Sequence, residues 1–410
     1  MGHCRIGVLA LALVAAMGCT AAGAGVAPDS TVLSTALGRS GAGAVVAQAS
    51  PTAEPQIPPP APNQTPGPNV VAPSPLDEGR PPPTVQMAPS PPQVVEGTEQ
   101  QLIHPVNPTI AGSAAGLLAY VVDRASNDVS VVDLAGNQVL SKIPVGRGPV
   151  EVAASPDGAR VYVVNQDDGS VSVIDVASQQ VTATWSGLPD ARDVAVLPDG
   201  SALYVTSPSA GEVVVLSTAD GSVVGRVPVG RGVAFVEVSR DGRRAYATLP
   251  EANQLAIIDT GGRQVLTTVG VEGRPEGLAV SPNGSAVYVA SRDASSVAVV
   301  STTDHTVANT IQTPPQPLRL AINADGTFAY VSHGEGSRIS VIDLGRQVIA
   351  GTLFLDNDAL GLALSPDGTR LYAAQREANQ IQAVDAATSF DLGTVAVGGS
   401  PDALVVVTRR

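Results

Sequence analysis

The chain has 410 residues, with 37 acidic against 23 basic side chains and a formal net charge of −14 at pH 7. Such a charge disfavours long contact with nucleic-acid phosphates or with an anionic membrane face, so nucleic acid is not expected as a partner. Cys4 and Cys19 are the only cysteines, which excludes a disulfide, a Cys metal site and a Cys nucleophile after residue 19.

Residues 1–24 have the features of an export signal. Arg5 precedes the apolar run 6–17, which is too short to span a bilayer. Two processing sites compete. Ala16-Met17-Gly18-Cys19 resembles the lipobox of bacterial lipoproteins, in which Cys19 would be lipidated and become the mature N-terminus. Ala22-Gly23-Ala24 is a small-residue site for ordinary signal peptidase.

These alternatives predict different locations for the mature protein. Lipidation at Cys19, the favoured interpretation, predicts an anchor on the outer side of the cytoplasmic membrane. Cleavage after Ala24 predicts a freely secreted or periplasmic protein. In both cases residues 25–107, rich in Ala and Gly and then in Pro, form a second segment. Because this segment cannot bury enough apolar surface to offset its ordering entropy, we expect a disordered Pro-rich linker.

A repeat with a period of 42 residues begins after the linker. It is marked by the only seven tyrosines of the chain, Tyr120, Tyr162, Tyr204, Tyr246, Tyr288, Tyr330 and Tyr372. A fixed period of roughly 40–45 residues is typical of a repeat architecture. We expect the tyrosines to pack between neighbouring repeats, with each hydroxyl reaching a polar partner.

Each period predicts four short β-strands. Six Asp-Gly or Asn-Gly pairs, such as Asp157-Gly158, predict a tight hairpin before the Tyr strand. A third, apolar strand follows the Tyr strand, as in 171–175, and a fourth follows in turn, as in 180–185. The first strands are expected to start at Pro149, Ala191, Val233, Pro275, Pro317, Ala359 and Pro401. Residues 108–410 therefore predict an all-β, seven-bladed β-propeller of four-stranded blades.

Ring closure can also be predicted from the pattern. The last start, at Pro401, leads into strand 402–408, which no Tyr strand follows. This C-terminal strand is expected to complete the first blade beside Tyr120. A competing strand, 107–113, lies one period before Pro149, but Leu404-Val405-Val406-Val407 has the stronger β-pattern.

The repeat resembles that of the YVTN-type seven-bladed β-propellers. Tyr162-Val163-Val164-Asn165 and Tyr204-Val205-Thr206-Ser207 come closest to the four letters of that name, and the Ser-Pro-Asp-Gly turn is also similar. The resemblance covers about residues 114–408. It implies a secreted or cell-surface protein, and it carries over no catalytic residue.

One face of the ring is expected to hold the chemically varied residues. The loops that lead into the inner strands converge there on the channel mouth, a common ligand site. The predicted ligand-binding residues are Arg147, Glu151, Arg192, Asp193, Arg231, Arg274, Glu276, Arg319 and Asp402. Guanidinium groups suit carboxylates and phosphates, so the expected partner is a small anion, a peptide or an envelope protein. Alternatively, these charges only pair with one another.

The function expected from these features is a binding or scaffold module of the cell envelope. The alternative is a hydrolase or lyase similar to the lactonase-like propellers, with its site at the mouth and His333 as candidate acid or base. A carboxylate cage or a His–acid pair at the mouth would favour the enzyme. No metal site and no cofactor are expected, because neither zinc-ligand spacing nor a phosphate-binding Gly-rich loop is present.

Overall fold

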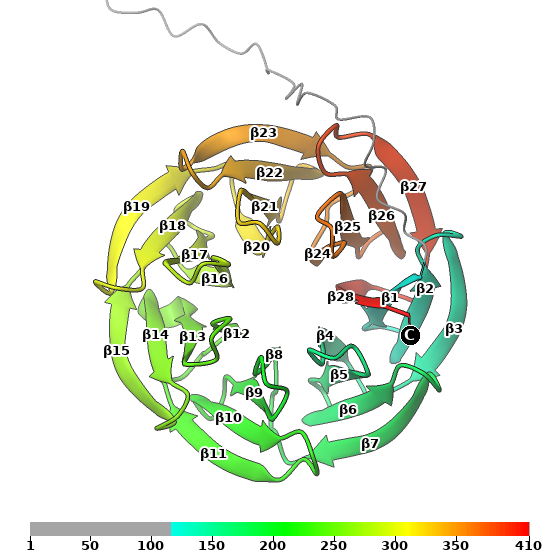
Figure 1. Ribbon diagram of the computed structural model, residues 1–410, viewed down its shortest axis with the longest axis horizontal. Coiled ribbons are helices and arrows are strands. Elements are labelled where there is room, and N and C mark those ends of the chain that lie inside the picture. Colours follow the sequence, from blue (N-terminus) through cyan, green and yellow to red (C-terminus); the bar gives the residue numbers. More distant parts are fainter. Residues whose placement is uncertain (1–115, 410) are drawn as a thin grey trace, which may run out of the picture. The chain divides into compact units, whose positions relative to one another are not determined.

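The described part of the chain is a ring of seven four-stranded antiparallel sheets (Figure 1). The computed structural model describes residues 116–409. The predicted export signal, Cys19 and the Pro-rich linker lie outside these residues. Within them the predicted all-β, seven-bladed propeller is confirmed.

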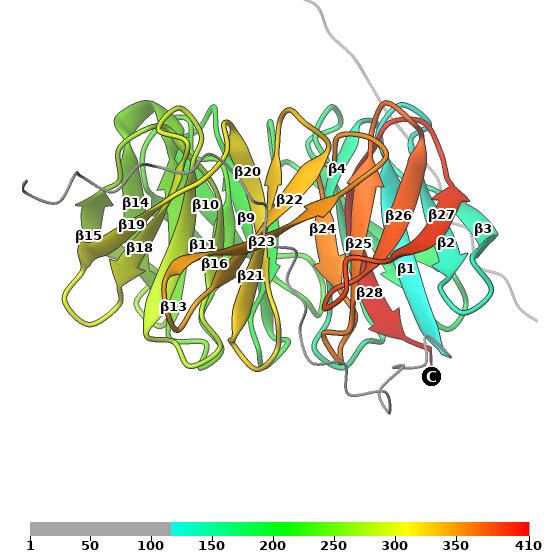
Figure 2. The ribbon, with the colours of Figure 1, turned by 90° about the horizontal axis from the view of Figure 1, so that it is seen from above.

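Each blade runs from an inner strand at the channel to an outer strand at the rim (Figures 1 and 2). The strands, from inside to outside, are as follows: blade 1, β28 (Pro401–Thr408), β1 (Leu117–Asp123), β2 (Asp128–Asp133), β3 (Gln138–Pro144); blade 2, β4 (Pro149–Ala154), β5 (Arg160–Asn165), β6 (Ser170–Asp175), β7 (Gln180–Ser186); blade 3, β8 (Val194–Val196), β9 (Ala202–Ser207), β10 (Glu212–Ser217), β11 (Val223–Pro228); blade 4, β12 (Val236–Val238), β13 (Arg244–Leu249), β14 (Gln254–Asp259), β15 (Gln264–Gly270); blade 5, β16 (Pro275–Val280), β17 (Ala286–Ser291), β18 (Ser296–Ser301), β19 (Thr306–Gln312); blade 6, β20 (Pro317–Ile322), β21 (Phe328–His333), β22 (Arg338–Asp343), β23 (Val348–Phe354); blade 7, β24 (Leu362–Leu364), β25 (Arg370–Gln375), β26 (Gln380–Asp385), β27 (Asp391–Ala396).

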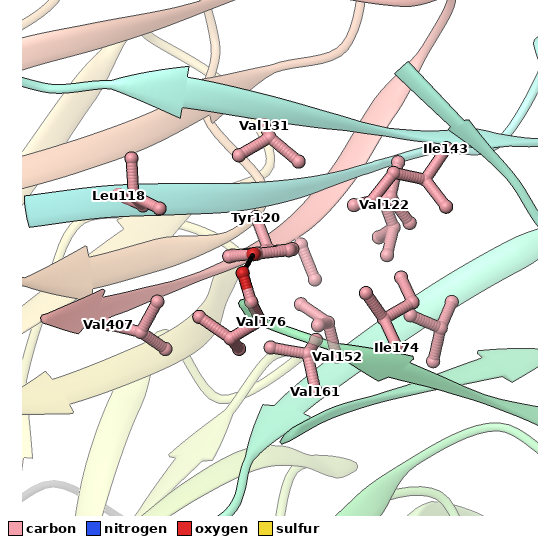
Figure 3. Close-up of a cluster of buried hydrophobic side chains, with 13 residues drawn as sticks. Leu118, Tyr120, Val122, Val131, Ile143, Val152, Val161, Ile174, Val176 and Val407 are labelled. Atoms are coloured by element: carbon pink, nitrogen blue, oxygen red, sulfur yellow. Dashed lines mark hydrogen bonds between the residues drawn. The ribbon is translucent and has the colours of Figure 1, made fainter. Parts of the chain in front are cut away.

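The hydrophobic core is divided among the seven contacts between neighbouring blades. Each cluster of buried side chains combines residues of two adjacent blades, and the cluster around Tyr120 joins blade 1 to Val152, Val161 and Ile174 of blade 2 (Figure 3). The Tyr120 hydroxyl donates to the carbonyl oxygen of Val176, also in blade 2. Each blade is therefore stabilised mainly by its neighbours.

The predicted packing of the tyrosines is confirmed, but the prediction that every hydroxyl reaches a polar partner is wrong for Tyr372, whose buried hydroxyl has no hydrogen-bond partner within residues 116–409. All seven rings are buried on the second strand of their blade. Tyr204 donates to Thr260 O at 3.2 Å and Tyr330 to Ala386 O at 3.4 Å, so both repeat the contact that Tyr120 makes with the next blade. One residue type recurs because each interface between blades needs the same aromatic volume with a polar tip.

Each inner strand is irregular where it approaches the mouth. In blade 1, Val122 pairs with Ala403 and Asp123 pairs with Pro401, so Asp402 is left out of the ladder. Equivalent register shifts interrupt β4, β16 and β20. A bulge bends the strand and redirects the side chain of the unpaired residue. The mouth residues therefore leave the regular alternation of the sheet.

Three inner strands start later than predicted. The strands expected from Ala191, Val233 and Ala359 begin at Val194, Val236 and Leu362. The residues in between still bond to the second strand, but outside the regular ladder. In blade 4, for example, the Ala234 amide donates to the Thr248 carbonyl at 2.9 Å. The same bulge causes this shortening, because the local bend breaks the regular pairing.

The C-terminal strand closes the ring as predicted. Strand β28 pairs with β1 from Leu117–Thr408 to Asp123–Pro401, and Leu404 and Val407 are buried. One short 3-10 turn, Pro250–Ala252, is the only helical element between residues 116 and 409. Within that range, therefore, no helix is long and apolar enough to cross a membrane.

Truncation tests the contribution of β28. A chain ending at Gly399 should lose more than about 5 kcal/mol, because it lacks the closing ladder and the buried Leu404, and this approaches the whole stability of a domain. A chain ending at Thr408 is the control and should unfold like the full chain. Denaturant unfolding measures both. Cooperative unfolding at an unchanged midpoint in the shorter chain would show that closure is dispensable.

A basic cup at the channel mouth

A cavity of about 410 Å³ lies at the channel mouth, and six of its thirteen lining residues are arginines. Its charged and polar lining residues are Arg124, Gln166, Arg192, Arg274, Glu276, Arg292, Arg319, Arg376 and Asp402. Phe235, Val150, Leu318 and Leu360 complete the wall. With six arginines against two carboxylates, the lining has a formal charge of +4. We call this cavity the cup. It is strongly basic although the chain is acidic.

The structure divides the predicted site residues into three groups. Arg192, Arg274, Glu276, Arg319 and Asp402 line the cup. Glu151 and Asp193 line a second cavity of about 330 Å³ along the channel, which shares Arg319 and Phe235 with the cup.

Arg147 and Arg231 form the third group and line neither cavity. Arg147 pairs with Asp168 at 2.6 Å and its side chain is 73% exposed, and Arg231 is also exposed. Both residues precede the glycine of their turn (Gly148 and Gly232), whereas Arg274 occupies the equivalent glycine position itself, with φ 58°. This difference of one residue in the turn separates them from Arg274.

The floor of the cup is built around Phe235. The guanidinium carbon of Arg319 lies 4.1 Å from the ring centroid, and that of Arg192 lies 4.8 Å from it. Both are cation–π contacts, which are stronger where water is excluded. Arg319 Nη1 also lies 2.7 Å from Glu151 Oε2, without hydrogen-bond alignment. Because β20 and β4 lie on opposite sides of the channel, this ion pair crosses it (Figure 1).

Arg319 is more deeply held than the other arginines of the cup. Burial alone would lower the pKa of its guanidinium, but Glu151 and Asp193 outweigh burial and raise the pKa. Removing this side chain would leave the carboxylate of Glu151 buried without a counter-charge, a change that typically costs about 3–5 kcal/mol. Arg319 is therefore both a wall of the cup and a structural residue.

Two carboxylates of the cup each hold two arginines. Glu276 Oε2 accepts from Arg192 Nη2 at 3.3 Å, and its Oε1 accepts from Arg274 Nε at 3.2 Å. We call these three residues triad A. The carboxylate is 6% exposed, whereas the two arginine side chains are 40% and 52% exposed. Triad A therefore presents guanidinium groups to the solvent of the cup and keeps its carboxylate beneath them.

Triad B repeats this arrangement on the opposite side of the mouth. Asp402 Oδ1 accepts from Arg376 Nε at 2.8 Å, and Asp402 Oδ2 lies 3.7 Å from Arg124 Nη1. Burial raises the pKa of Asp402, although both arginines oppose that shift. Glu276 and Asp402 occupy the same position of the repeat, three periods apart. Residues from blades 3 and 5 make triad A, and residues from blades 7 and 1 make triad B.

Three arginines of the cup were not included in the predicted site. Arg124, Arg292 and Arg376 each follow the Tyr of their repeat by four residues, as does Gln166. Aligning the repeats at the 42-residue period places these residues in one ring around the mouth. The Arg124 guanidinium donates to Gln166 at 3.1 Å across adjacent blades, so that ring is joined by contacts between blades.

Glu237 is a second residue that the sequence-based site omits. It lines the channel cavity at a position where the other repeats have Ala153, Ala195, Ala279, Ala321, Ala363 and Val405. The Glu237 side chain is partly buried on the wall of this cavity. Burial, reinforced by the charge of Asp193, raises its pKa to about 8. Burial and the charge of Glu151 raise the pKa of Asp193 to about 7.

Both ring nitrogens of His333 have partners within the fold, which gives this histidine a structural role. The side chain is buried, with Nδ1 3.0 Å from the Pro315 carbonyl oxygen and Nε2 2.9 Å from Ser340 Oγ. A carbonyl can only accept, so Nδ1 carries the proton. Burial lowers the pKa of His333. Asn165 contacts Ser172 from the equivalent position in blade 2. The catalytic role of His333 stays a prediction that these contacts do not support.

The described side chains do not form a metal site. Among residues 116–409 no group of three or more His, Asp or Glu side chains could hold a metal ion. The lining of the cup is instead rich in guanidinium groups, which donate hydrogen bonds. Each guanidinium of the two triads has five N–H donors, and its hydrogen bonds and ion pairs within residues 116–409 use at most two of them.

Comparisons with known proteins identify the fold alone. No family model and no curated protein matches the chain. Similar solved structures include hydrazine synthase of Kuenenia stuttgartiensis, with TM-score 0.58 and 20% identity over 63% of this chain and 89% of that chain. A functionally unknown protein from Desulfotomaculum acetoxidans has TM-score 0.63 and 17% identity, over 72% and 99%. Dihydro-heme d1 dehydrogenase NirN, in complex with DHE, has TM-score 0.56 and 17% identity, over 75% and 78%.

The raised pKa of Glu237 predicts a pH-dependent stability. Glu237 binds its proton more tightly in the folded chain than in the unfolded chain, where its pKa is the ordinary 4.5. The stability that this proton contributes is therefore complete below pH 4.5 and is lost as pH rises through about 8. Glu237→Gln should therefore raise the free energy of unfolding relative to wild type by about 1 kcal/mol or more at pH 9, and by little at pH 4. Denaturant unfolding from pH 4 to pH 9 measures this difference.

Glu251→Gln, at an exposed carboxylate of the same blade, is the control and should leave the pH profile unchanged. Parallel profiles for wild type and Glu237→Gln would contradict the prediction. The free energy of unfolding of Glu237→Gln should still fall in part as pH rises, because Asp193, whose pKa is raised to about 7, still titrates.

Proposed function

We propose that this propeller is a binding module of the cell envelope, and that it holds a small anionic ligand in the cup. The observation that carries the proposal is the formal charge of +4 of the cup lining in an acidic chain. A basic concavity concentrates anions and orients them by charge-assisted hydrogen bonds. The volume of about 410 Å³ suits a small molecule.

The arrangement of the arginines supports binding over mutual neutralisation. Glu276 and Asp402 hold four of the arginines in place, but the contacts of each guanidinium within residues 116–409 use at most two of its five N–H donors. A donor that is already positioned loses less side-chain entropy when a ligand arrives. The ion pairs of the cup therefore orient its binding groups in advance.

The location in the envelope rests on the sequence before the propeller. Arg5, the short apolar run and Cys19 support export and lipid anchoring, and the Pro-rich segment would act as the tether. In this arrangement the cup samples solutes or envelope partners outside the cytoplasmic membrane.

The hydrolase or lyase alternative depends on a carboxylate cage or a His–acid pair at the mouth. The cup has neither among residues 116–409, since its two carboxylates each pair with arginines and His333 contacts Pro315 and Ser340. The geometry of the cup therefore does not favour that alternative.

Anion titrations test the ligand site. Calorimetry on the full chain at low salt should detect binding of phosphate or of a simple carboxylate. Arg274→Gln should weaken binding of the best anion about tenfold or more, since a charge-assisted contact contributes roughly 1.5–3 kcal/mol. Added salt should weaken the wild type further. Arg147→Gln, outside the cup, is the control. Equal affinities in both variants would place the anion elsewhere.

The anchor is tested by fractionation. Cys19→Ala should move the propeller from the membrane fraction into the soluble fraction, because the lipid would have no attachment site. The N-terminus of the released wild-type protein is mapped in parallel. Identical fractionation of both forms, with a mature N-terminus at Gly25, would instead establish free secretion.

A further inference from the structure

The two triads lie on opposite sides of one cavity and have the same composition. Each consists of two arginines and one carboxylate, and each has a formal charge of +1. Blade 6 separates them on one side of the ring and blade 2 on the other. Both face the same cup, because all six residues line it.

The chemistry of a single triad matches one anionic group. Its carboxylate neutralises one arginine, and the remaining charge can be balanced by one carboxylate or one monoanionic phosphate ester. Bidentate contact requires two parallel N–H donors, which a half-exposed guanidinium such as that of Arg274 or Arg376 still offers. One anion in one triad leaves the opposite triad uncompensated.

We propose that the cup takes a small molecule with two anionic groups, one bound by each triad. This inference rests on the proposed function and names its ligand class. The charge of Arg319 is already offset by Glu151. The cup wall also includes Leu318 and Leu360, which are only partly buried and supply an apolar surface for the part that joins the two ends of the ligand. The ligand is therefore a linear diacid with an uncharged spacer.

The spacer length provides the sharpest test. A second contact made within one molecule gains affinity only if the linker spans both sites, and the gain declines when the linker is too long. Saturated dicarboxylates of increasing length are titrated into the full chain at low salt, together with the monocarboxylate of the same carbon number. We expect one length to bind at least tenfold more tightly than its monocarboxylate, with weaker binding on either side.

Two variants test the contribution of each triad to diacid binding separately. Arg274→Gln in triad A and Arg376→Gln in triad B should each reduce affinity for the best diacid to that of its monocarboxylate. Arg147→Gln, beside the mouth but outside the cup, should retain the full preference for the diacid. Thermal unfolding of each variant checks that the fold is intact, since both substituted side chains are half-exposed.

The possible results distinguish this inference from the function on which it rests. If monocarboxylates and phosphate bind, but no diacid binds more tightly at any length, the cup is an anion site and the two-ended ligand is wrong. The same conclusion follows if only one of the two variants affects diacid binding. If no probe binds, the anion-binding function fails as well. Tight binding of an acidic peptide with no binding of any diacid would overturn the small-molecule class.

Discussion

The antiparallel ladder between β1 and β28 is the contact on which the ring depends. A propeller blade buries its faces against two neighbours, so an open ring would expose one face at each end. The ladder joins the first and last described strands, and it places Leu404 and Val407 in two different clusters between blades. The closing strand also carries Asp402, so the same contact that completes the core positions one half of the cup.

Positions that are identical in every repeat and positions that differ between repeats have different roles in this chain. Positions that are alike in every period, such as the tyrosines, build identical interfaces between blades. Positions that vary are concentrated where each inner strand bulges toward the mouth, because a residue outside the ladder need not fit a neighbouring sheet. Arg192, Glu276 and Asp402 all occupy this bulge position in their repeats. The scaffold thus leaves a ring of variable sites at one end of the channel.

The limits of prediction follow from this division. The 42-residue period was sufficient to predict seven blades and the closing strand, since packing requires the same residue type at each interface. It could not predict that Arg319 reaches Glu151 across the channel, because an alignment of repeats contains no information about side-chain direction. The same limitation placed Arg147 in the predicted site, although it pairs with Asp168 and does not line the cup. The position of Arg124, Arg292 and Arg376 within the repeat was available as a signal, whereas their contacts required coordinates.

The location of Asp402 on β28 also bears on biosynthesis. Strand β28 is the last of the ring's strands in chain order. A nascent polypeptide that still lacks it therefore has Arg124 and Arg376 but not Asp402, the carboxylate that joins them. A chain interrupted before β28 would therefore have triad A but not triad B. Only a fully synthesised and closed propeller would acquire the complete cup, so ligand capture could begin only after the ring has formed.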